Sequence, residues 1–277
     1  MLARIWGCRG SLATPGPDTV TYGGNTSCVE LRLADGTLLV LDAGTGIRRL
    51  GSTLRGGPKT IHLLLTHLHI DHIEGLGFFG PIWDEQTELH VWGPPSPRRT
   101  LAERIARYLS PPLFPIQLSS IPARMHFHDV PDDAWQIGTA TVVADPVFHP
   151  GPTVGYRVQE NGAGIAYIPD HEPALGADLA AATPDWVSGM RVAGGADVLL
   201  HDSQFTRCEY DERVGWGHSC VDDAVRFARL AEARRVVLFH HDPQHSDREL
   251  ESLLEHACEV AERDDLVLAR EGMEITL

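Results

Sequence analysis

The segment 66–72 constrains this chain more than any other part of its sequence. It reads Thr-His-Leu-His-Ile-Asp-His, so three imidazoles and one carboxylate fall within six consecutive positions, 67–72. The apolar run 61–65 comes directly before it and predicts a buried strand. Imidazole and carboxylate groups together suit Zn²⁺, Mn²⁺ or Fe as ligands. The sequence therefore predicts a metal site where this strand ends and a loop begins.

Three further apolar runs also end in a possible ligand or acid. The four runs are 61–65 before His67, 164–168 before Asp170, 196–200 before His201 and Asp202, and 236–239 before His240. Open α/β sheets bind ligands at such strand ends, so we expect these groups to converge at one sheet edge. Taken singly, Asp170 or Asp202 is more typical of a helix N-cap or a turn. The set of four runs favours a convergent site.

The chain has 277 residues and no linker or charge block that would divide it. The possible ligands extend from His67 to His240, which predicts one domain over 1–277. No apolar stretch approaches membrane-spanning length, and the N-terminal residues lack the apolar core of a signal peptide. The five cysteines form no Cys-x-x-Cys pair and have irregular spacing, which indicates reduced thiols. These features predict a cytoplasmic protein without membrane attachment.

The formal net charge of −15 argues against long nucleic acid as a partner, because such proteins need basic surface to replace phosphate counterions. The pairs Arg98-Arg99 and Arg234-Arg235 are isolated and indicate solvated helix faces. A small phosphate-bearing substrate remains compatible with this charge, because two bound metal ions carry a local positive charge of their own.

Short strands at both ends of the chain, with helices among them, predict an α/β fold built as a four-layer αββα sandwich. One helix is predicted after Ser219, where apolar side chains recur on one face, and a second opens with a capping box at 246–249. A third is predicted over 97–109. The Pro-rich segment 93–124 carries apolar side chains that rarely stay exposed in a monomer, so it fits either a lid over the site or a homodimer contact.

The pattern His-x-His-x-Asp-His at 67–72 resembles the signature of the metallo-β-lactamase superfamily, whose fold is the αββα sandwich. Further family motifs follow in order, including the strand 38–41 that ends in Asp42. The resemblance implies two divalent metal ions, Zn²⁺ first, with Mn²⁺ or Fe²⁺ as alternatives. The ligand sets it implies are His67, His69 and His149 for one ion, Asp71, His72 and His240 for the other, and Asp170 as a bridge.

The same resemblance gives Asp71 a second role, as general base toward the bridging water. His241 follows His240 directly, and the sequence leaves open which of the two imidazoles binds. The strand-end position favours His240. His241 then becomes a group on the substrate side or behind the ligands.

The motif Gly217-His218-Ser219 and the preceding strand ending at Asp202 resemble the phosphodiesterase branch that includes tRNase Z. In that branch an acid holds the motif histidine, which is catalytic, and Asp202 stands where Glu is more usual. Phosphodiester hydrolysis needs a proton for the leaving alkoxide, and a histidine kept cationic by a carboxylate can supply it. Taken alone, His218 is more typical of a helix N-terminus without a chemical role.

The tRNase Z enzymes carry a Gly- and Pro-rich arm, often between the third and fourth metal motifs. Here about twenty residues separate His149 from Asp170, which leaves room only for a pair of strands. With the acidic charge, this predicts a small phosphodiester such as a cyclic nucleotide as substrate. Two alternatives stay open: a lactonase or thioesterase of the same fold, without need of His218 as acid, and a non-hydrolytic accessory protein of cofactor biosynthesis.

Overall fold

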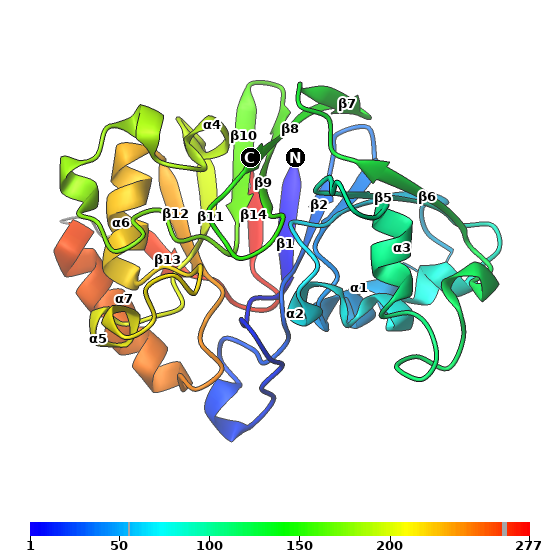
Figure 1. Cartoon of the computed structure of the whole chain (residues 1–277), viewed down its shortest axis with the longest axis horizontal. Helices are drawn as coiled ribbons and strands as arrows, with labels where there is room; N and C mark the ends of the chain where they lie inside the picture. The colour runs from blue at the N-terminus through cyan, green and yellow to red at the C-terminus, as the bar shows by residue number, and fades with distance from the viewer. Residues whose placement is uncertain (55, 262–264) are drawn as a thin grey trace.

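The computed structural model describes residues 1–54, 56–261 and 265–277. Two seven-stranded sheets lie face to face, with helices on their outer sides (Figure 1). The first sheet has the order β14 (Glu274–Thr276), β1 (Leu2–Gly7), β2 (Cys28–Arg32), β3 (Leu38–Leu41), β4 (Thr60–Leu64), β5 (Glu88–Gly93) and β6 (Arg124–Asp129). The second has the order β13 (Leu266–Leu268), β12 (Arg235–Phe239), β11 (Val198–Asp202), β10 (Ala163–Ile168), β9 (Val154–Glu160), β8 (Ala140–Pro146) and β7 (Trp135–Ile137).

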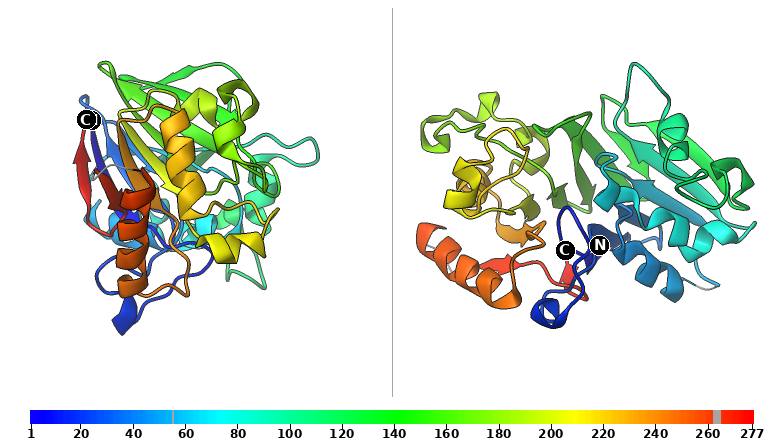
Figure 2. Two further views of the ribbon diagram at one scale, coloured as in Figure 1. Left: turned by 90° about the vertical axis from the view of Figure 1, so that its left-hand side faces the viewer. Right: turned by 60° about the horizontal axis from the view of Figure 1, so that its bottom comes forward.

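Helices cover the outer face of each sheet. Those of the first half are α1 (Gly46–Thr53), α2 (Ile70–Ile73) and α3 (Leu101–Ala106), and those of the second half are α4 (Met190–Ala193), α5 (Arg207–Asp211), α6 (Val221–Leu230) and α7 (Asp247–Ala261). In Figure 2, α6 and α7 lie against the second sheet, and both helices contact its strands. Within the described ranges, none of these helices is long and apolar enough to cross a membrane.

The strands that matter for the site are parallel. In the first sheet β3, β4, β5 and β6 run parallel to one another, and in the second β10, β11, β12 and β13 do so. Parallel strands bring their carboxyl ends to the same edge of a sheet. The loops that follow β3, β4, β10, β11 and β12 therefore open toward one region between the two sheets.

Alternating burial along the strands explains the layers. On β12, Val237 and Phe239 pack between the sheets, whereas Val236 and Leu238 pack on the side of α6 and α7. Strands buried on both faces are almost continuously apolar, as these are. The first sheet repeats the pattern, because Ile61 of β4 packs outward with residues of α1. The predicted αββα sandwich is confirmed.

The helices after Ser219 and Ser246 form as predicted, and the Ser246 hydroxyl and Glu249 carboxylate make the expected capping box. The helix predicted over 97–109 is wrong in extent. Only Leu101–Ala106 is helical, because the Thr100 side chain accepts a hydrogen bond from the Glu103 amide and fixes the start. The strands β6, β7, β13 and β14 were not predicted; the last three span three residues each, too few for a pattern to be recognised.

The segment 93–124 folds beside the loop that carries the histidine motif. The Tyr108 hydroxyl donates a hydrogen bond to the carbonyl of Glu74, two residues beyond that motif. The Phe114 ring is buried, whereas Leu113 is 72% exposed. The function of the segment 93–124 as a lid or as a homodimer contact stays a prediction.

Candidate metal centre

Asp42 organises the loop that follows β4. It comes directly after β3 with a left-handed backbone (φ 59°), and its carboxylate is fully buried. One oxygen accepts the Thr66 amide at 2.7 Å, and the other lies 2.8 Å from Nδ1 of His72 and 3.0 Å from the Tyr167 hydroxyl. Because an ionised carboxylate only accepts hydrogen bonds, His72 donates from Nδ1 and turns Nε2 toward the space between the sheets.

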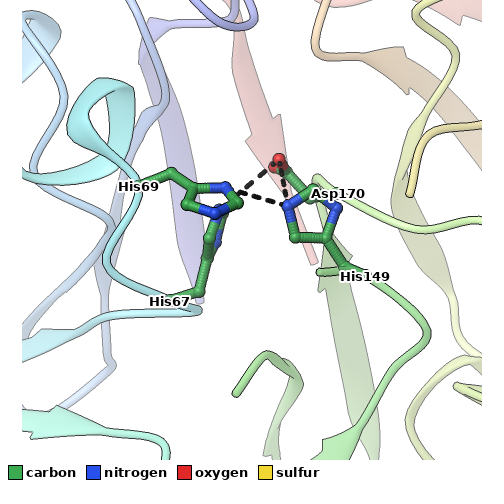
Figure 3. A group of neighbouring side chains, drawn as sticks. All are labelled: His67, His69, His149 and Asp170. Atoms are coloured by element: carbon green, nitrogen blue, oxygen red, sulfur yellow. Dashed lines mark hydrogen bonds and ion pairs between the residues drawn. The ribbon is translucent and has the colours of Figure 1, made fainter. Parts of the chain in front are cut away.

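A first ligand group joins the two halves of the molecule (Figure 3). Its members are His67, His69, His149 and Asp170, and one potential ligand atom from each lies within 4.8 Å of the others. Nε2 of His149 lies 3.0 Å from Nδ1 of His69, and Nε2 of His67 and of His149 each lie 3.6 Å from Oδ2 of Asp170. Nδ1 of His149 donates to the carbonyl of Gly217 at 2.7 Å, which leaves its Nε2 for the site.

A second group consists of Asp71, His72 and His240. Oδ2 of Asp71 lies 3.2 Å from Nε2 of His72 and 3.3 Å from Nε2 of His240. The same two nitrogens lie 3.0 and 3.3 Å from Oδ1 of Asp170. Asp170 therefore turns Oδ2 to the first group and Oδ1 to the second, as a carboxylate that bridges two sites would.

The structure separates the two adjacent histidines that the sequence left open. His240 has a left-handed backbone (φ 62°), and its Nδ1 lies 3.0 Å from Oε1 of Gln204, so that Nε2 faces the second group. His241 instead donates from Nε2 to the carbonyl of Ala269 at 2.9 Å. Only His240 reaches the site.

The donor set fits divalent metal ions. Among the described residues, Nε2 of His67, Nε2 of His72 and Oδ1 of Asp170 are buried without a hydrogen-bond partner. Buried polar atoms nearly always have partners. Nε2 of His67 belongs to the first ligand group and the other two atoms to the second, where metal ions would satisfy them. Burial lowers the pKa of His67 well below its usual range and that of His149 to about 4, which favours the neutral imidazole that binds metal.

His218 and Asp202 lie beside both groups. Nδ1 of His218 lies 2.8 Å from Oδ2 of Asp202 and 3.9 Å from Oδ2 of Asp170, and its ring stacks on that of His240. Asp202 is fully buried and also accepts the amides of His171 and Gln204. Burial opposes a charged imidazole, but the Asp202 carboxylate outweighs it and raises the pKa of His218 to about 9. The ring is 12% exposed, so it reaches solvent.

The structure thus brings the seven predicted metal ligands together with His218 and Asp202. It also adds Glu172, whose carboxylate accepts the Gly215 amide at 2.8 Å, the Gly217 amide at 2.7 Å and the Tyr210 hydroxyl at 3.0 Å. These bonds hold the loop that carries His218. The sequence indicated this residue only as an acid two positions after Asp170, in the loop that follows β10.

His201 does not point into the site, unlike its neighbour Asp202. Its ring stacks on Phe227 at 4.6 Å, and its Nε2 lies 3.0 Å from Nδ1 of His171, both rings being fully buried. Strand residues alternate in direction, so His201 and Asp202 face opposite sides of β11. Only the carboxylate contributes to the site.

Comparison with known proteins extends these observations. The model of the "Beta-lactamase superfamily domain" matches residues 37–241. A ribonuclease Z of Streptococcus suis (strain 98HAH33) is 25% identical over 304 aligned positions, covering 91% of this chain and 94% of that protein. The metallo-β-lactamase fold protein YhfI from Bacillus subtilis superposes with a TM-score of 0.71 at 17% identity, over 99% of this chain and 98% of that one. A diphosphatase from the PhnP family gives a TM-score of 0.70 at 20% identity, over 100% and 97% of the two chains.

Fold and site together define a hydrolase of the metallo-β-lactamase fold. The matched segment covers well over half of the chain, from the residue before β3 to His241, two residues beyond β12. The chain belongs to the β-lactamase superfamily domain family. The family resemblance predicted from the sequence is confirmed.

Proposed function

We propose that the chain hydrolyses a small phosphodiester, a cyclic nucleotide or a related nucleotide phosphodiester, with two divalent metal ions. Zn²⁺ is the first choice of metal, and Mn²⁺ and Fe²⁺ are the alternatives, because imidazole and carboxylate ligands suit all three. The observation that carries the proposal is the His218–Asp202 pair, at 2.8 Å, beside both ligand groups. A site that needed only metal ions would not require this pair.

In this proposal His67, His69 and His149 hold one ion, Asp71, His72 and His240 hold the other, and Asp170 serves both. When bound, such ions supply the activation of water and the neutralisation of charge on the phosphate oxygens. Asp71 takes the proton of the attacking water. Its Oδ2 also accepts the Ser11 amide at 2.8 Å, which keeps the carboxylate facing the site.

His218 is proposed as the general acid. Asp202 accepts from Nδ1 and so leaves Nε2 to donate a proton to the departing oxygen. An alkoxide is a poor leaving group without a proton, so the acid matters most for substrates that release a sugar hydroxyl. A thioester releases a thiolate, which leaves without this help. The thioesterase alternative therefore predicts little dependence on His218, whereas a lactone also releases an alkoxide and is distinguished by substrate preference.

The proposed substrate is small because of two features. The chain between His149 and Asp170 forms the hairpin of β9 and β10, closed by a tight turn at 161–162, where the tRNase Z enzymes often carry an RNA-gripping arm. The net charge is −15, which disfavours a polyanion. The proteins named above include both a ribonuclease and a diphosphatase, so the proposed substrate size depends on these two features.

We also propose that 1–277 is one functional domain. The possible ligands come from both halves, His67 and His69 from the loop after β4 and Asp170 and His240 from the ends of β10 and β12. Neither sheet alone would carry a complete set. Separate halves should therefore bind no metal at this site.

A panel of substrates offered to metal-loaded protein tests the function. It should contain a chromogenic phosphodiester, cyclic nucleotides, a lactone, a thioester and pre-tRNA. We expect turnover of the small phosphodiesters and weak or no cleavage of pre-tRNA. Efficient 3′-end cleavage of pre-tRNA at low enzyme concentration would overturn the small-substrate proposal. Preference for the lactone or the thioester would replace it with the alternative.

A further inference from the structure

A second set of histidines lies on the first sheet, away from the site described above. His62 of β4, His90 of β5 and His126 of β6 are direct neighbours in the register of three parallel strands. Their rings stack, with centroid separations of 4.9 Å between His62 and His90 and 4.8 Å between His90 and His126. Each of the three adjacent strands thus contributes one imidazole to a row across the sheet.

The row lies apart from the catalytic edge, the region at the strand ends where the two ligand groups and His218 lie. His90 and His126 are each the third residue of their strand, whereas the ligand groups follow the carboxyl ends of strands. Their side chains face away from α1 and α3, since the alternate residues Leu89 and Val91 pack on that side. The imidazoles of His90 and His126 are 23% and 43% exposed, so the second sheet does not cover them. In Figure 1, β5 and β6 lie on the side of the molecule opposite β11 and β12.

Glu88 completes a possible ligand set. Its Oε1 lies 3.0 Å from Nε2 of His126 and 3.8 Å from Nε2 of His90, and one ligand atom from each of the three residues lies within 4.8 Å of the others. Around a tetrahedral ion with bonds of 2.0–2.2 Å, ligand atoms lie about 3.3–3.6 Å apart. Small rotations of the Glu88 and His126 side chains, which are 34% and 43% exposed, would bring the three atoms to that spacing.

The ring of His90 is held in the orientation that this site needs. Its Nδ1 lies 3.0 Å from Nε2 of His128, whose ring stacks on Trp92 at 4.2 Å. Its Nε2 is therefore left on the side of Glu88. Burial lowers the pKa of His90, and the neighbouring His126 adds to that effect, which favours the neutral form that binds metal.

We propose that Glu88, His90 and His126 bind one further divalent transition-metal ion, for which Zn²⁺ is the probe. Two imidazoles and a carboxylate are a ligand set found at zinc sites with an open fourth position. The exposure of His126 leaves that position to water or to a group from outside the chain. A row of imidazoles that serves only as polar strand surface would bind no ion at a defined stoichiometry.

The test counts zinc by equilibrium dialysis and elemental analysis, with the catalytic centre already loaded. Wild-type protein should take up one equivalent more than the double variant His90→Ala/His126→Ala across the micromolar range. The affinity for this equivalent should fall by at least about 10–100-fold in the variant, because loss of even a supporting residue behind a ligand has that effect. His256→Ala is the matched control, since this exposed imidazole pairs with one carboxylate, that of Asp222, among the residues that the structure describes. It should keep the extra equivalent.

Equal zinc uptake by the wild type and the double variant would overturn the proposal, as would an equal loss in His256→Ala. Because the measured quantity is a difference between proteins with the same catalytic centre, failure of the phosphodiesterase proposal would not affect it. Circular dichroism checks that the double variant folds. If it does not, Glu88→Gln decides, because the amide keeps the size of the side chain and removes the charge. Unchanged zinc affinity in Glu88→Gln would then reject the site.

Discussion

The molecule carries two groups of imidazoles that differ in the residues that hold each ring. At the catalytic edge, Nδ1 of His72 donates to the Asp42 carboxylate at 2.8 Å, and Nδ1 of His149 donates to the Gly217 carbonyl at 2.7 Å. Both of these imidazoles are buried. In the row at Glu88 the partner of His90 is another imidazole, His128, and both rings are partly exposed.

The two groups show that a metal site depends on the residues that orient its ligands as well as on the ligands themselves. Buried acceptors fix the ring orientation and the tautomer before any ion arrives, and they raise the basicity of the ligand nitrogen. Buried carboxylates such as Asp71 and Asp170 are costly to keep charged without partners. We therefore expect the catalytic edge to bind metal far more tightly than the row and to lose more when it is altered.

The largest effect should come from Asp170→Ala. Because one carboxylate faces both ligand groups, its loss should remove most of both ions and reduce hydrolysis to background. Elemental analysis of gently purified protein supplied with Zn²⁺ and Mn²⁺ measures the ion content. Asp145→Ala is the control, since this carboxylate pairs with Arg191 at 3.5 Å and belongs to neither ligand group. A wild-type protein that holds at most one ion at this edge would contradict the dinuclear proposal.

The next effect in size concerns His218, which lies at the same edge without being a proposed ligand. His218→Ala should keep both ions and lose about 10²–10⁴ in turnover of a substrate that releases a sugar alkoxide, the range of a positioned acid. Asp202→Asn should behave in the same way but more mildly, since the imidazole remains.

The leaving group provides the control for this prediction. A nitrophenolate needs little protonation, so His218→Ala should impair a nitrophenyl ester much less than an alkoxide substrate. Equal losses on the two substrates would mean that His218 binds phosphate or supports the fold. Unchanged turnover of the alkoxide substrate would remove His218 from the mechanism and favour the lactonase or thioesterase alternative.

The ligands could be predicted from the sequence because they are concentrated in short motifs at strand ends. His67, His69, Asp71 and His72 lie within one loop, and the strand before Asp170 is recognisable from its apolar residues alone. The αββα fold followed from the same runs, since strands buried on both faces are continuously apolar.

The groups behind the ligands could not be predicted in this way. Gln204 contacts His240 across 36 positions of the chain, and Glu172 contacts Gly217 across 45, so no local pattern joins the members of either pair. The histidine row was missed for the same reason. Its members come from three strands, one of which, β6, was not predicted.

Asp42→Asn tests directly whether buried support distinguishes the two imidazole groups. An amide nitrogen cannot accept the bonds that Oδ2 of Asp42 now takes from His72 and Tyr167. We expect metal affinity at the second ligand group to fall by about 10–100-fold, as is usual for residues behind a ligand. Chelator competition measures the affinity, and Asp145→Asn serves as the control. Unchanged affinity would mean that His72 is held well enough by its surroundings, and the contrast with the row would lose its explanation.

The smallest effect should come from Glu172→Gln, which touches neither a proposed ligand nor His218. Both oxygens of Glu172 accept hydrogen bonds, two of them from the amides of Gly215 and Gly217. Glutamine retains one acceptor and turns its NH₂ group toward donors, so about one charge-assisted hydrogen bond, worth about 1.5–3 kcal/mol, is lost. The loop should loosen, and with it the position of His218 relative to Asp202. We expect kcat on an alkoxide substrate to fall by about 10-fold, since the loop can relax and retain part of that energy.

Metal content should stay nearly the same in Glu172→Gln, because the Gly217 carbonyl in this loop supports only one proposed ligand, His149. The nitrophenyl substrate should lose much less activity than the alkoxide substrate, because it needs the acid less. Tyr210→Phe is the matched control. It removes a single hydroxyl bond to the same carboxylate while both backbone amides stay bound, so its effect should be smaller still. If Glu172→Gln lost activity equally on both substrates, the residue would act through the metal ligands or the fold instead. The site would then depend on one undivided network, and the separation between metal binding and proton donation at this edge would be wrong.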